Sequence, residues 1–357
     1  MIELESIRKS YGQHLVLNNL SLNVSKYETA VLLGPNGVGK TTVLNIIAGI
    51  VSPDYGRVVI DNRIVFEKMN SRIINVPPEL RQIGYVPQDY ALFPHLSVYE
   101  NIAFGLSARK LSENDIRRRV KELIDFLSLN GIENKYPHQL SGSEKQKVAL
   151  ARALAPEPRV ILLDEQLSSI DPGFREYIRW ELREFLKKLK ITTLIVTHNL
   201  NDAWALADRI MIMLKGTIVS YGTPHNILSR IKSREVAKFL GLNALEGRIV
   251  RRYGNNAIIR ICDDIELIAK NTTNNVSEGD KVLVIFRPDD VIIHSRKESN
   301  MITNVIKAKI LRTQISKCNM KLFLQLSQNN VITAEISRGY IFNLIKNQQL
   351  MNSMIYI

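Results

Sequence analysis

The segment GPNGVGKT, residues 34–41, limits the possible folds of this chain more than any other stretch. It follows a continuous apolar run, TAVLL, and opens a segment, KTTVLNIIAGI, whose apolar residues lie close to helical spacing. A glycine-rich turn between a buried strand and a helix lets backbone amides point at phosphate oxygens, and the helix N-terminus favours negative charge. The sequence therefore predicts an α/β fold with a phosphate-binding loop.

The side chains of this loop indicate ATP and Mg²⁺ as its ligands. Lys40 can place its charge at the β- and γ-phosphates, and the Thr41 hydroxyl can bind Mg²⁺. A chance glycine-rich turn is the alternative, but the flanking strand and helix argue against it. The predicted nucleotide contacts of the loop are Gly34, Pro35, Asn36, Gly37, Val38, Gly39, Lys40, Thr41 and Thr42.

A second apolar run, RVILLDE at residues 159–165, carries two carboxylates at its end. A strand here places Asp164 where it can hold Mg²⁺ through water. Glu165 follows directly and can polarise an attacking water. An acidic strand end with no chemical role is the alternative, and the phosphate loop in the same chain makes the catalytic interpretation the better one.

Two further changes in pattern divide the chain. SENDIRRRVKELIDFLSLNG predicts a helix that begins at Ser112 and stops at Gly131. We place it in a helical subdomain of about residues 90–158, inside a nucleotide-binding domain of residues 1–240. From residue 241 to 357, short strands separated by Gly, Asn and Asp turns predict an all-β domain. A pattern of about fifty residues recurs there, which predicts two OB-like halves.

Charge and cysteine content narrow the possible partners. The chain has 48 Lys and Arg residues against 35 Asp and Glu residues, and this net charge of +13 could suit nucleic acid or an anionic membrane surface. The basic clusters are short and stand beside acids, as at residues 117–119, so we expect dispersed surface charge and no nucleic-acid partner. Cys262 and Cys318 lack metal-binding spacing. No apolar run approaches about 18 residues, so we expect any membrane span to come from other chains.

Across roughly residues 1–240 the chain resembles the ATP-binding subunits of ABC transporters, because their motifs occur here in the family order. The further matches are Tyr11, Gln88 in GYVPQDY, residues 140–144 in LSGSE, Asp171 in LSSID and His198 in IVTHN. Taken singly, each has an ordinary structural explanation, such as a packed ring or a loop amide. Their shared order favours the family role.

The resemblance implies a function for each matched residue. Tyr11 would stack on adenine, Gln88 would reach Mg²⁺ and the attacking water, and His198 would contact the γ-phosphate. Asp171 would cross to a partner subunit. The expected catalytic residues are therefore Glu165, His198 and Gln88, and the expected metal contacts are Thr41, Gln88 and Asp164.

The LSGSE segment implies a dimer. In the family, two subunits pack head to tail, and the ATP held by one subunit is capped by the signature of the other. Ser141, Gly142 and Ser143 would make that contact here, and the expected partner is a second copy of the same chain.

Three residues depart from the family pattern. Gln166 stands where a proline normally follows the catalytic glutamate, Ser143 replaces a glycine, and Glu144 replaces a glutamine. Ser141 and Glu144 form the S-x-x-E pattern of a capping box, whose carboxylate also suits the helix dipole. We expect Gln166 to tune the rate and the signature to remain functional.

Three segments resemble importers in particular. Residues 72–106 are similar to import ATPases for oxyanions, polyamines, sugars and iron, and FRPDDVIIH at residues 286–294 resembles the TOBE domain of such importers. Residues 233–249 are similar to molybdate and tungstate subunits, so an oxyanion is the favoured cargo and polyamine, sugar or iron are the alternatives. The resemblance implies integral membrane permease subunits, an indirectly acting extracytoplasmic solute-binding protein, and a peripheral position on the cytoplasmic face of the membrane.

Two other functions have less support. Non-transport ABC ATPases usually contain a long coiled-coil insert or two cassettes, whereas about a hundred residues without a heptad run separate the phosphate loop from LSGSE here. A subunit without catalysis is disfavoured because Lys40, Glu165 and His198 are all present.

Overall fold

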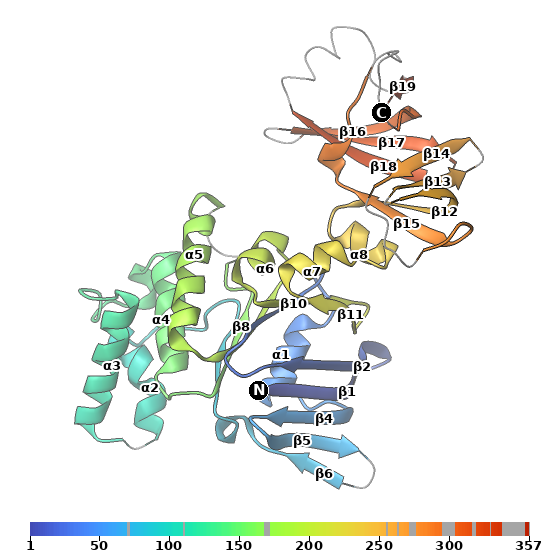
Figure 1. The fold of residues 1–357 in the computed structure, drawn as a ribbon. Coiled ribbons are helices and arrows are strands. Elements are labelled where there is room, and N and C mark those ends of the chain that lie inside the picture. Colours follow the sequence, from blue (N-terminus) through green and yellow to red (C-terminus); the bar gives the residue numbers. More distant parts are fainter. Residues whose placement is uncertain are drawn as a thin grey trace. The chain divides into compact units, whose positions relative to one another are not determined.

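The computed structural model describes residues 1–69, 72–109, 111–167, 172–254, 256–262, 264–270, 276–294, 304–315, 319–328, 330–337 and 354–356. The chain divides into two compact units, Met1–Arg230 and Ile231–Ile357 (Figure 1). Each unit has its own hydrophobic core.

The first unit contains a six-stranded sheet. In spatial order it consists of β11 (Thr217–Gly222), β10 (Arg209–Leu214), β3 (Thr29–Leu33), β9 (Thr192–Thr197), β8 (Val160–Asp164) and β7 (Ile83–Val86). All neighbours are parallel except β10 and β11. β3, β8 and β9 are buried along their whole length, which explains why the sequence shows them as continuous apolar runs.

A second sheet is antiparallel. In spatial order it consists of β2 (His14–Val24), β1 (Ile2–Tyr11), β4 (Tyr55–Ile60), β5 (Arg63–Met69) and β6 (Arg72–Asn75). β4 and β5 form a predicted hairpin, because Asp61 and Asn62 at its turn adopt φ values of 47° and 64°. Helix α1 (Lys40–Ala48) connects the two sheets, since its Leu44 shares one core with Leu4 of β1 and Leu194 of β9.

The helices lie mainly between β7 and β9 in sequence. They are α2 (Val98–Ala108), α3 (Glu113–Leu127), α4 (Gly142–Leu154) and α5 (Pro172–Leu189), followed later by α6 (Leu200–Leu206) and α7 (Pro224–Ser229). Two short 3₁₀ helices, η1 (Pro78–Leu80) and η2 (Pro137–Gln139), precede β7 and α4. Within the described ranges, no helix is both long and apolar enough to cross a membrane.

The ends of α3 test one sequence prediction. Its start at Ser112 is confirmed, because the Ser112 hydroxyl accepts a hydrogen bond from the Asp115 amide. Its predicted stop at Gly131 is wrong, since the helix ends at Leu127. Ser128 takes the left-handed conformation there, with φ 55°, and its amide bonds the last carbonyls of the helix. A serine thus fills the place where a glycine was expected.

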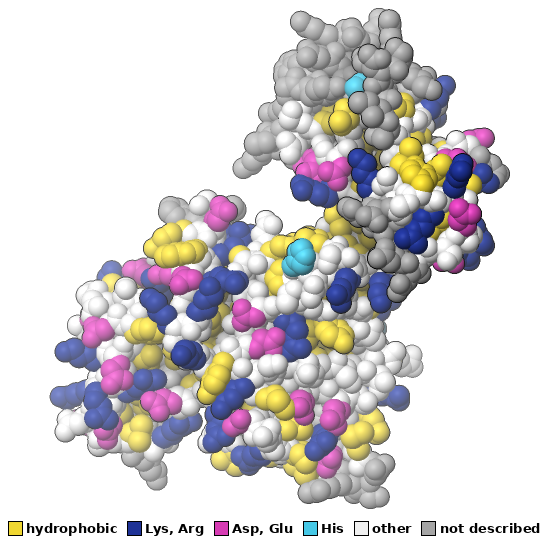
Figure 2. Space-filling model, in the orientation of Figure 1, with side chains coloured by type: hydrophobic (Ala, Val, Ile, Leu, Met, Phe, Trp, Pro, Cys, Tyr) yellow, Lys and Arg dark blue, Asp and Glu magenta, His cyan; other side chains and the backbone are white. Residues whose placement is uncertain are grey.

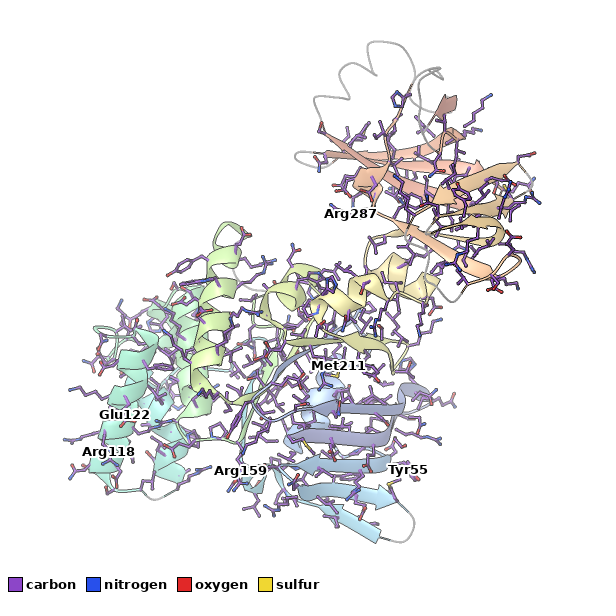
Figure 3. All side chains as sticks on the ribbon, viewed as in Figure 1. Tyr55, Arg118, Glu122, Arg159, Met211 and Arg287 are labelled. Carbon is purple, nitrogen blue, oxygen red and sulfur yellow. The ribbon has the colours of Figure 1, made fainter. Side chains whose placement is uncertain are left out.

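The basic cluster at residues 117–119 lies on α3 and is balanced by acids on the same helix. The pairs are Arg117 with Glu113 at 3.6 Å, Arg118 with Asp115 at 3.0 Å, and Arg119 with Glu122 at 3.1 Å. Arg118 and Glu122 extend from the helix into solvent (Figure 3). Basic and acidic side chains also alternate over the face shown in Figure 2. The cluster is therefore a solvated helix surface.

The second unit begins with α8 (Arg234–Phe239) and contains two antiparallel sheets. The first consists in spatial order of β14 (Ile265–Ala269), β13 (Asn256–Cys262), β12 (Asn243–Tyr253) and β15 (Lys281–Phe286). The second consists of β18 (Asn330–Ser337), β17 (Asn319–Ser327), β16 (Lys307–Ile315) and β19 (Met354–Tyr356). Both sheets have the same strand topology. A short 3₁₀ helix, η3 (Pro288–Asp290), follows β15, and Cys318 lies outside the described residues.

Candidate active site

The parallel sheet brings four predicted motifs to one edge. β3 leads into the phosphate loop, β9 ends just before His198, β8 ends at Asp164, and β7 ends shortly before Gln88. These strands are adjacent in the order β3-β9-β8-β7 and run parallel. Their carboxyl ends therefore lie side by side, which is where ligands bind in open α/β sheets.

The phosphate loop leaves the start of α1 open. Gly39 is the N-cap residue, has φ 104° and makes no side-chain hydrogen bond to the helix, whose described first turn has no acidic residue. A Cβ on Gly39 would lie 2.8 Å from Cγ1 of Val16, so both the conformation and the space require glycine. The first amides of α1 therefore remain available to an anion.

Lys40, Glu165 and His198 form one connected group. Lys40 is 5% exposed, its ammonium donates to the Pro35 carbonyl at 2.9 Å, and its Nζ lies 3.7 Å from Glu165 Oε1. His198 Nδ1 lies 3.0 Å from the same carboxylate oxygen. An ionised Glu165 carboxylate can only accept in this contact, for which His198 Nδ1–H is then the donor. Burial lowers the pKa of Lys40, and the nearby Glu165 and Asp164 charges oppose that shift.

Glu165 holds an unusual backbone conformation. Its φ of 44° lies in the left-handed region, which costs about 1–2 kcal/mol for a residue with a side chain. Its amide donates to the Val196 carbonyl at 2.9 Å and so extends the pairing of β8 with β9. Strain of this kind occurs where the direction of a side chain matters. Here it accompanies a carboxylate that reaches both Lys40 and His198.

Asp164 has surroundings that fit a metal ligand. Its side chain is 2% exposed, and its Oδ1 has no hydrogen-bond partner in the described part of the chain. Burial raises the pKa of Asp164, while hydrogen bonds from the Thr41 and Tyr85 hydroxyls oppose the shift. A buried carboxylate with one unpaired oxygen beside a threonine hydroxyl suits Mg²⁺, which prefers oxygen ligands. No cluster of three or more His, Cys, Asp or Glu side chains that could hold a metal occurs within the described ranges.

Of the remaining predicted residues, Gln88 and Tyr11 lie near the site, whereas the position of Asp171 is not described. Gln88 is exposed beside the strand ends. Tyr11 is 50% exposed at the end of β1, and its hairpin approaches the phosphate loop where Val16 meets Gly39. Asp171 lies outside the described residues.

The capping box predicted at the signature is confirmed. The Ser141 hydroxyl accepts from the Glu144 amide at 3.3 Å, and the Ser141 amide donates to Glu144 Oε2 at 2.7 Å. The hydrogen bond from the Ser141 hydroxyl is the main reason that the pKa of Glu144 is lowered. Ser141 and Gly142 are exposed, and no hydrogen bond between described residues joins them to the phosphate loop. Within the described part of one chain, the two turns predicted to bind phosphate are therefore not joined.

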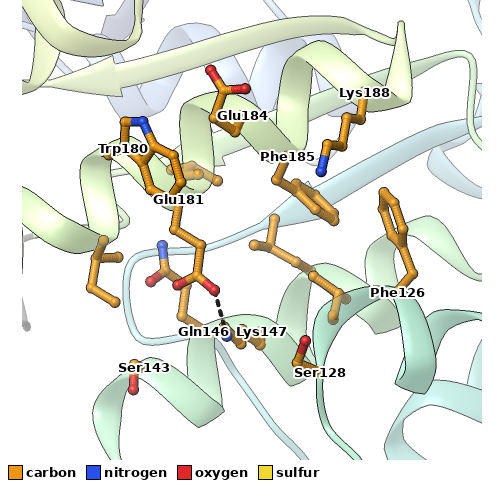
Figure 4. Close-up of a pocket in the computed structure, with 14 residues that line it drawn as sticks. Phe126, Ser128, Ser143, Gln146, Lys147, Trp180, Glu181, Glu184, Phe185 and Lys188 are labelled. Carbon is orange, nitrogen blue, oxygen red and sulfur yellow. Dashed lines mark ion pairs between the residues drawn. The ribbon is translucent and has the colours of Figure 1, made fainter.

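A cavity of about 260 Å³ lies beside the signature helix, between α3, α4 and α5 (Figure 4). Ser143, Gln146 and Phe185 contribute to its lining. Lys147 and Glu181 form an ion pair of 2.7 Å across it, which ties α4 to α5. No residue from the four strand ends lines this cavity, so it belongs to the packing of the helices.

Three residues that support the site were not predicted as such. Tyr85 lies beside Asp164, where its hydroxyl opposes the rise in the pKa of that carboxyl, and burial is the main reason that the pKa of Tyr85 itself is raised. Gln166 is 2% exposed, and its amide donates to the backbone of the loop that follows β7. Arg81 donates to two carbonyls at the end of α1, at 2.8 and 2.9 Å, and burial lowers its pKa to about 10. All three lie next to a motif in sequence, but nothing local marks their long-range partners.

Comparison with known proteins shows to which family this chain belongs. The family described as "ABC transporter" matches residues 17–168. The chain is 40% identical over 309 residues to a spermidine/putrescine import ATP-binding protein PotA of Clostridium acetobutylicum, covering 86% of this chain and 84% of that protein. It is 36% identical over 319 residues to the PotA protein of Haemophilus influenzae, covering 88% and 82%. Neither name mentions an oxyanion, so the comparisons do not support the expected molybdate or tungstate cargo.

Solved structures agree with the sequence relatives. A dimeric ATP-binding cassette in a post-hydrolysis state with ADP and Pi has 31% identity and a TM-score of 0.54, covering 62% of this chain and 98% of that chain. The protein cbiO1 from Clostridium perfringens, part of an ABC transporter complex, has 32% identity and a TM-score of 0.57, covering 64% and 90%. This chain therefore belongs to the ATP-binding proteins of ABC transporters and is an ATPase of the importer type.

Proposed function

We propose that this chain hydrolyses ATP to drive polyamine uptake through separate membrane subunits. The observation that carries the catalytic part is the connected group of Lys40, Glu165 and His198, with contacts of 3.7 and 3.0 Å at the edge of the parallel sheet. The cargo rests on two relatives that are named as spermidine/putrescine import ATP-binding proteins.

In this proposal Glu165 is the general base. Its carboxylate orients the attacking water and accepts its proton. His198 holds that carboxylate through Nδ1 and, when doubly protonated, can also donate from Nε2 to the γ-phosphate. Lys40 contributes a buried positive charge that is already held at the loop by the Pro35 carbonyl.

Mg²⁺ would be held by Thr41 and Asp164, with Gln88 as a further contact. The bound ion would supply positive charge against the negative charge that develops on the transferred phosphoryl group. The protein's own contribution is the unpaired Oδ1 of the buried Asp164, with the Thr41 and Tyr85 hydroxyls nearby. This combination supports a metal site that is complete only when nucleotide phosphates add their oxygens.

Two copies of the chain would pack head to tail around two ATP molecules. Ser141, Gly142 and Ser143 of one copy would cap the ATP bound by the phosphate loop of the other, with Asp171 beside them and Tyr11 on the adenine. The exposure of Ser141 and Gly142 supports this arrangement. Two cassette structures similar to this chain are also described as dimeric.

The proposed assembly includes permease subunits in the membrane and an extracytoplasmic binding protein that delivers the polyamine to them. The chain itself would lie on the cytoplasmic face as a peripheral subunit. The C-terminal β unit, with its TOBE-like motif at residues 286–294, would stabilise or regulate the dimer. The import function named for both relatives supports this assembly.

The cargo can be tested by deleting the gene for this chain in its own host. Uptake of labelled spermidine and putrescine should fall to background, while uptake of labelled molybdate should be unchanged. Wild-type protein supplied in trans should restore polyamine uptake, and Glu165→Gln should not. Loss of molybdate uptake with normal polyamine uptake would overturn the proposed cargo and leave the ATPase assignment in place.

A further inference from the structure

Gln166 occupies a position between the catalytic carboxylate and the loop that carries Gln88. It directly follows Glu165, at the place where the sequence departs from the proline expected in the family. Its side chain is 2% exposed, so its polar atoms have little access to water. The contacts of a buried amide must then be made inside the protein.

The amide of Gln166 donates to the backbone on both sides of a strand boundary. Its Nε2 lies 3.1 Å from the Val86 carbonyl oxygen, 3.3 Å from that of Pro87 and 2.9 Å from that of Asp164. Three acceptors around one atom fix the orientation of the amide, because an oxygen at that place would face three other oxygens. One NH₂ group therefore ties the end of β8 to the two residues that precede Gln88.

The same loop is held by two further contacts. The Tyr90 hydroxyl donates to the Gln166 carbonyl at 3.1 Å, and the buried Tyr90 ring anchors the far side of Gln88. Arg152 of α4 donates to the carbonyls of Tyr90 at 2.7 Å and Ala91 at 2.6 Å. The loop is thus fastened both to the catalytic strand end and to the signature helix.

Gln166 is not the residue that would give the most stable fold at this position. Its Oε1 is buried and has no hydrogen-bond partner among the described residues. An unpaired buried acceptor is destabilising, and an apolar side chain of similar shape would avoid that loss. What an apolar side chain could not supply is the hydrogen bonding that sets the path of the loop relative to Glu165.

We propose that Gln166 is a positioning residue for ATP hydrolysis, which acts by holding the Gln88 loop at a fixed place beside Glu165. The inference rests on the roles proposed above for Gln88 and Glu165. Gln166 need not touch ATP or water for this role. A displacement of about 1 Å in a reacting constellation can cost about 10²-fold in rate, so a loop held by one amide can limit turnover.

The test uses the full-length chain and the substitution Gln166→Met, which keeps the length of the side chain and removes both polar ends. We expect kcat for ATP to fall about tenfold and KM to stay within about twofold, because the loop adds little to ground-state binding. The melting temperature should change little, because losing the unpaired Oε1 offsets the loss of the donor to the three carbonyls. Thr193→Val is the matched control, because Thr193 is fully buried on β9, in the same sheet, and its hydroxyl makes one backbone hydrogen bond at 3.2 Å.

A double-mutant cycle with Gln88→Ala separates positioning from a general structural effect. If Gln166 acts through the loop, the double variant should be no slower than Gln88→Ala alone. If Gln166→Met does not fold, Tyr90→Phe removes the hydroxyl that donates to Gln166 and should lower kcat about threefold, again without effect in a Gln88→Ala background.

Each result of this cycle decides one question. A Gln166→Met kcat within twofold of wild type, or effects that multiply in the double variant, would overturn the positioning role. A Gln88→Ala enzyme with wild-type kcat would instead overturn the proposed function of Gln88, and with it the route through which Gln166 acts. Loss of activity in proportion to a lowered melting temperature would leave Gln166 as a structural residue only.

Discussion

The amino ends of α1 and α4 are both predicted to bind phosphate, but they are built differently. The N-cap of α1 is Gly39, which supplies no side-chain cap, and the described first turn has no acidic residue. The N-cap of α4 is Ser141, whose hydroxyl and amide are both hydrogen-bonded to Glu144 in a capping box. The start of α1 therefore leaves its N–H donors available to an anion. At the start of α4, by contrast, the capping box already uses N–H donors within the same chain.

We expect this difference to separate ATP binding, which needs one chain, from the closing of two chains around ATP. An open helix end next to the buried Lys40 can hold phosphate within a single chain. A helix end that is already capped offers mainly its exposed surface, at Ser141 and Gly142, to a second molecule. We therefore expect α1 to govern ATP binding by one chain and α4 to govern hydrolysis by the dimer.

Glu165→Gln should have the largest effect on the α1 side. Glutamine keeps the size of the side chain but cannot act as a base, so phosphate release should fall about 10²- to 10⁴-fold. Neither ATP binding at α1 nor capping by α4 needs this charge, so an ATP-bound dimer should accumulate. Phosphate release and size-exclusion chromatography with ATP measure the two effects. The exposed Glu79→Gln serves as the control, and equal rates for the two variants would show that Glu165 is not the base.

Gly142→Asp should affect α4 without affecting α1. An added Cβ at Gly142 meets no atom within 4 Å, so the single chain should fold and bind ATP normally. In a head-to-tail dimer the new carboxylate would face the partner's phosphates, and hydrolysis should fall at least about tenfold. Fluorescence titration with a labelled nucleotide and steady-state phosphate release separate the two effects. Loss of nucleotide binding by the folded variant would contradict the division of roles between the two helices.

Mixing two variants sharpens the same prediction. Lys40→Ala disables the α1 end, and Gly142→Asp disables the α4 end. In an equal mixture half of the dimers contain one copy of each, and each such dimer has one site built from two intact ends. The mixture should therefore regain about a quarter of the wild-type rate, well above the rate of either variant alone. Absence of any recovery would contradict a head-to-tail dimer.

The sequence predicts those features whose signals are local. Strands β3, β8 and β9 are visible because complete burial requires continuous apolar residues. The turn at Asp61 and Asn62 is visible because few residues tolerate positive φ, and the capping box is visible because it spans only Ser141 to Glu144. Together with the motifs from the phosphate loop to His198, whose order resembles ABC transporter subunits, they indicate both the fold and the ATPase activity.

Contacts between distant segments leave no such signal. Gln166 and Val86 are 80 residues apart, and only the pairing of β7 with β8 brings them together. Tyr85 meets Asp164 for the same reason. The Ser128 cap shows a second limit, since a polar residue can adopt the conformation that sequence reasoning assigns to glycine. The oxyanion cargo favoured by the sequence is not supported by the relatives, and the residues that choose a cargo would lie in other subunits.

Ser143→Gly should have a small effect on the α4 end. Ser143 lies inside α4 and does not have positive φ, so the glycine of the family pattern is not needed to relieve strain. Its hydroxyl lies 3.3 Å from that of Ser141, in the exposed turn. We expect the ATPase rate to stay within about twofold and stability to fall by about 0.5–1 kcal/mol, since glycine weakens a helix. A many-fold higher rate would show that the natural turn is a weakened signature.

The smallest effect concerns the charge of Glu144, which has no counterpart at the start of α1. Hydrogen bonds from Ser141 lower the pKa of Glu144, so its carboxylate adds stability above the ordinary value of 4.5 and loses that contribution as pH falls through the lower folded-state pKa. Glu144→Gln keeps a capping side chain without the charge. The melting temperature of wild type should therefore exceed that of Glu144→Gln by a constant margin from pH 7 to about 5, and the margin should shrink at lower pH. A margin that is unchanged at about pH 3 would mean that the hydrogen bonds, not the charge, close this helix end.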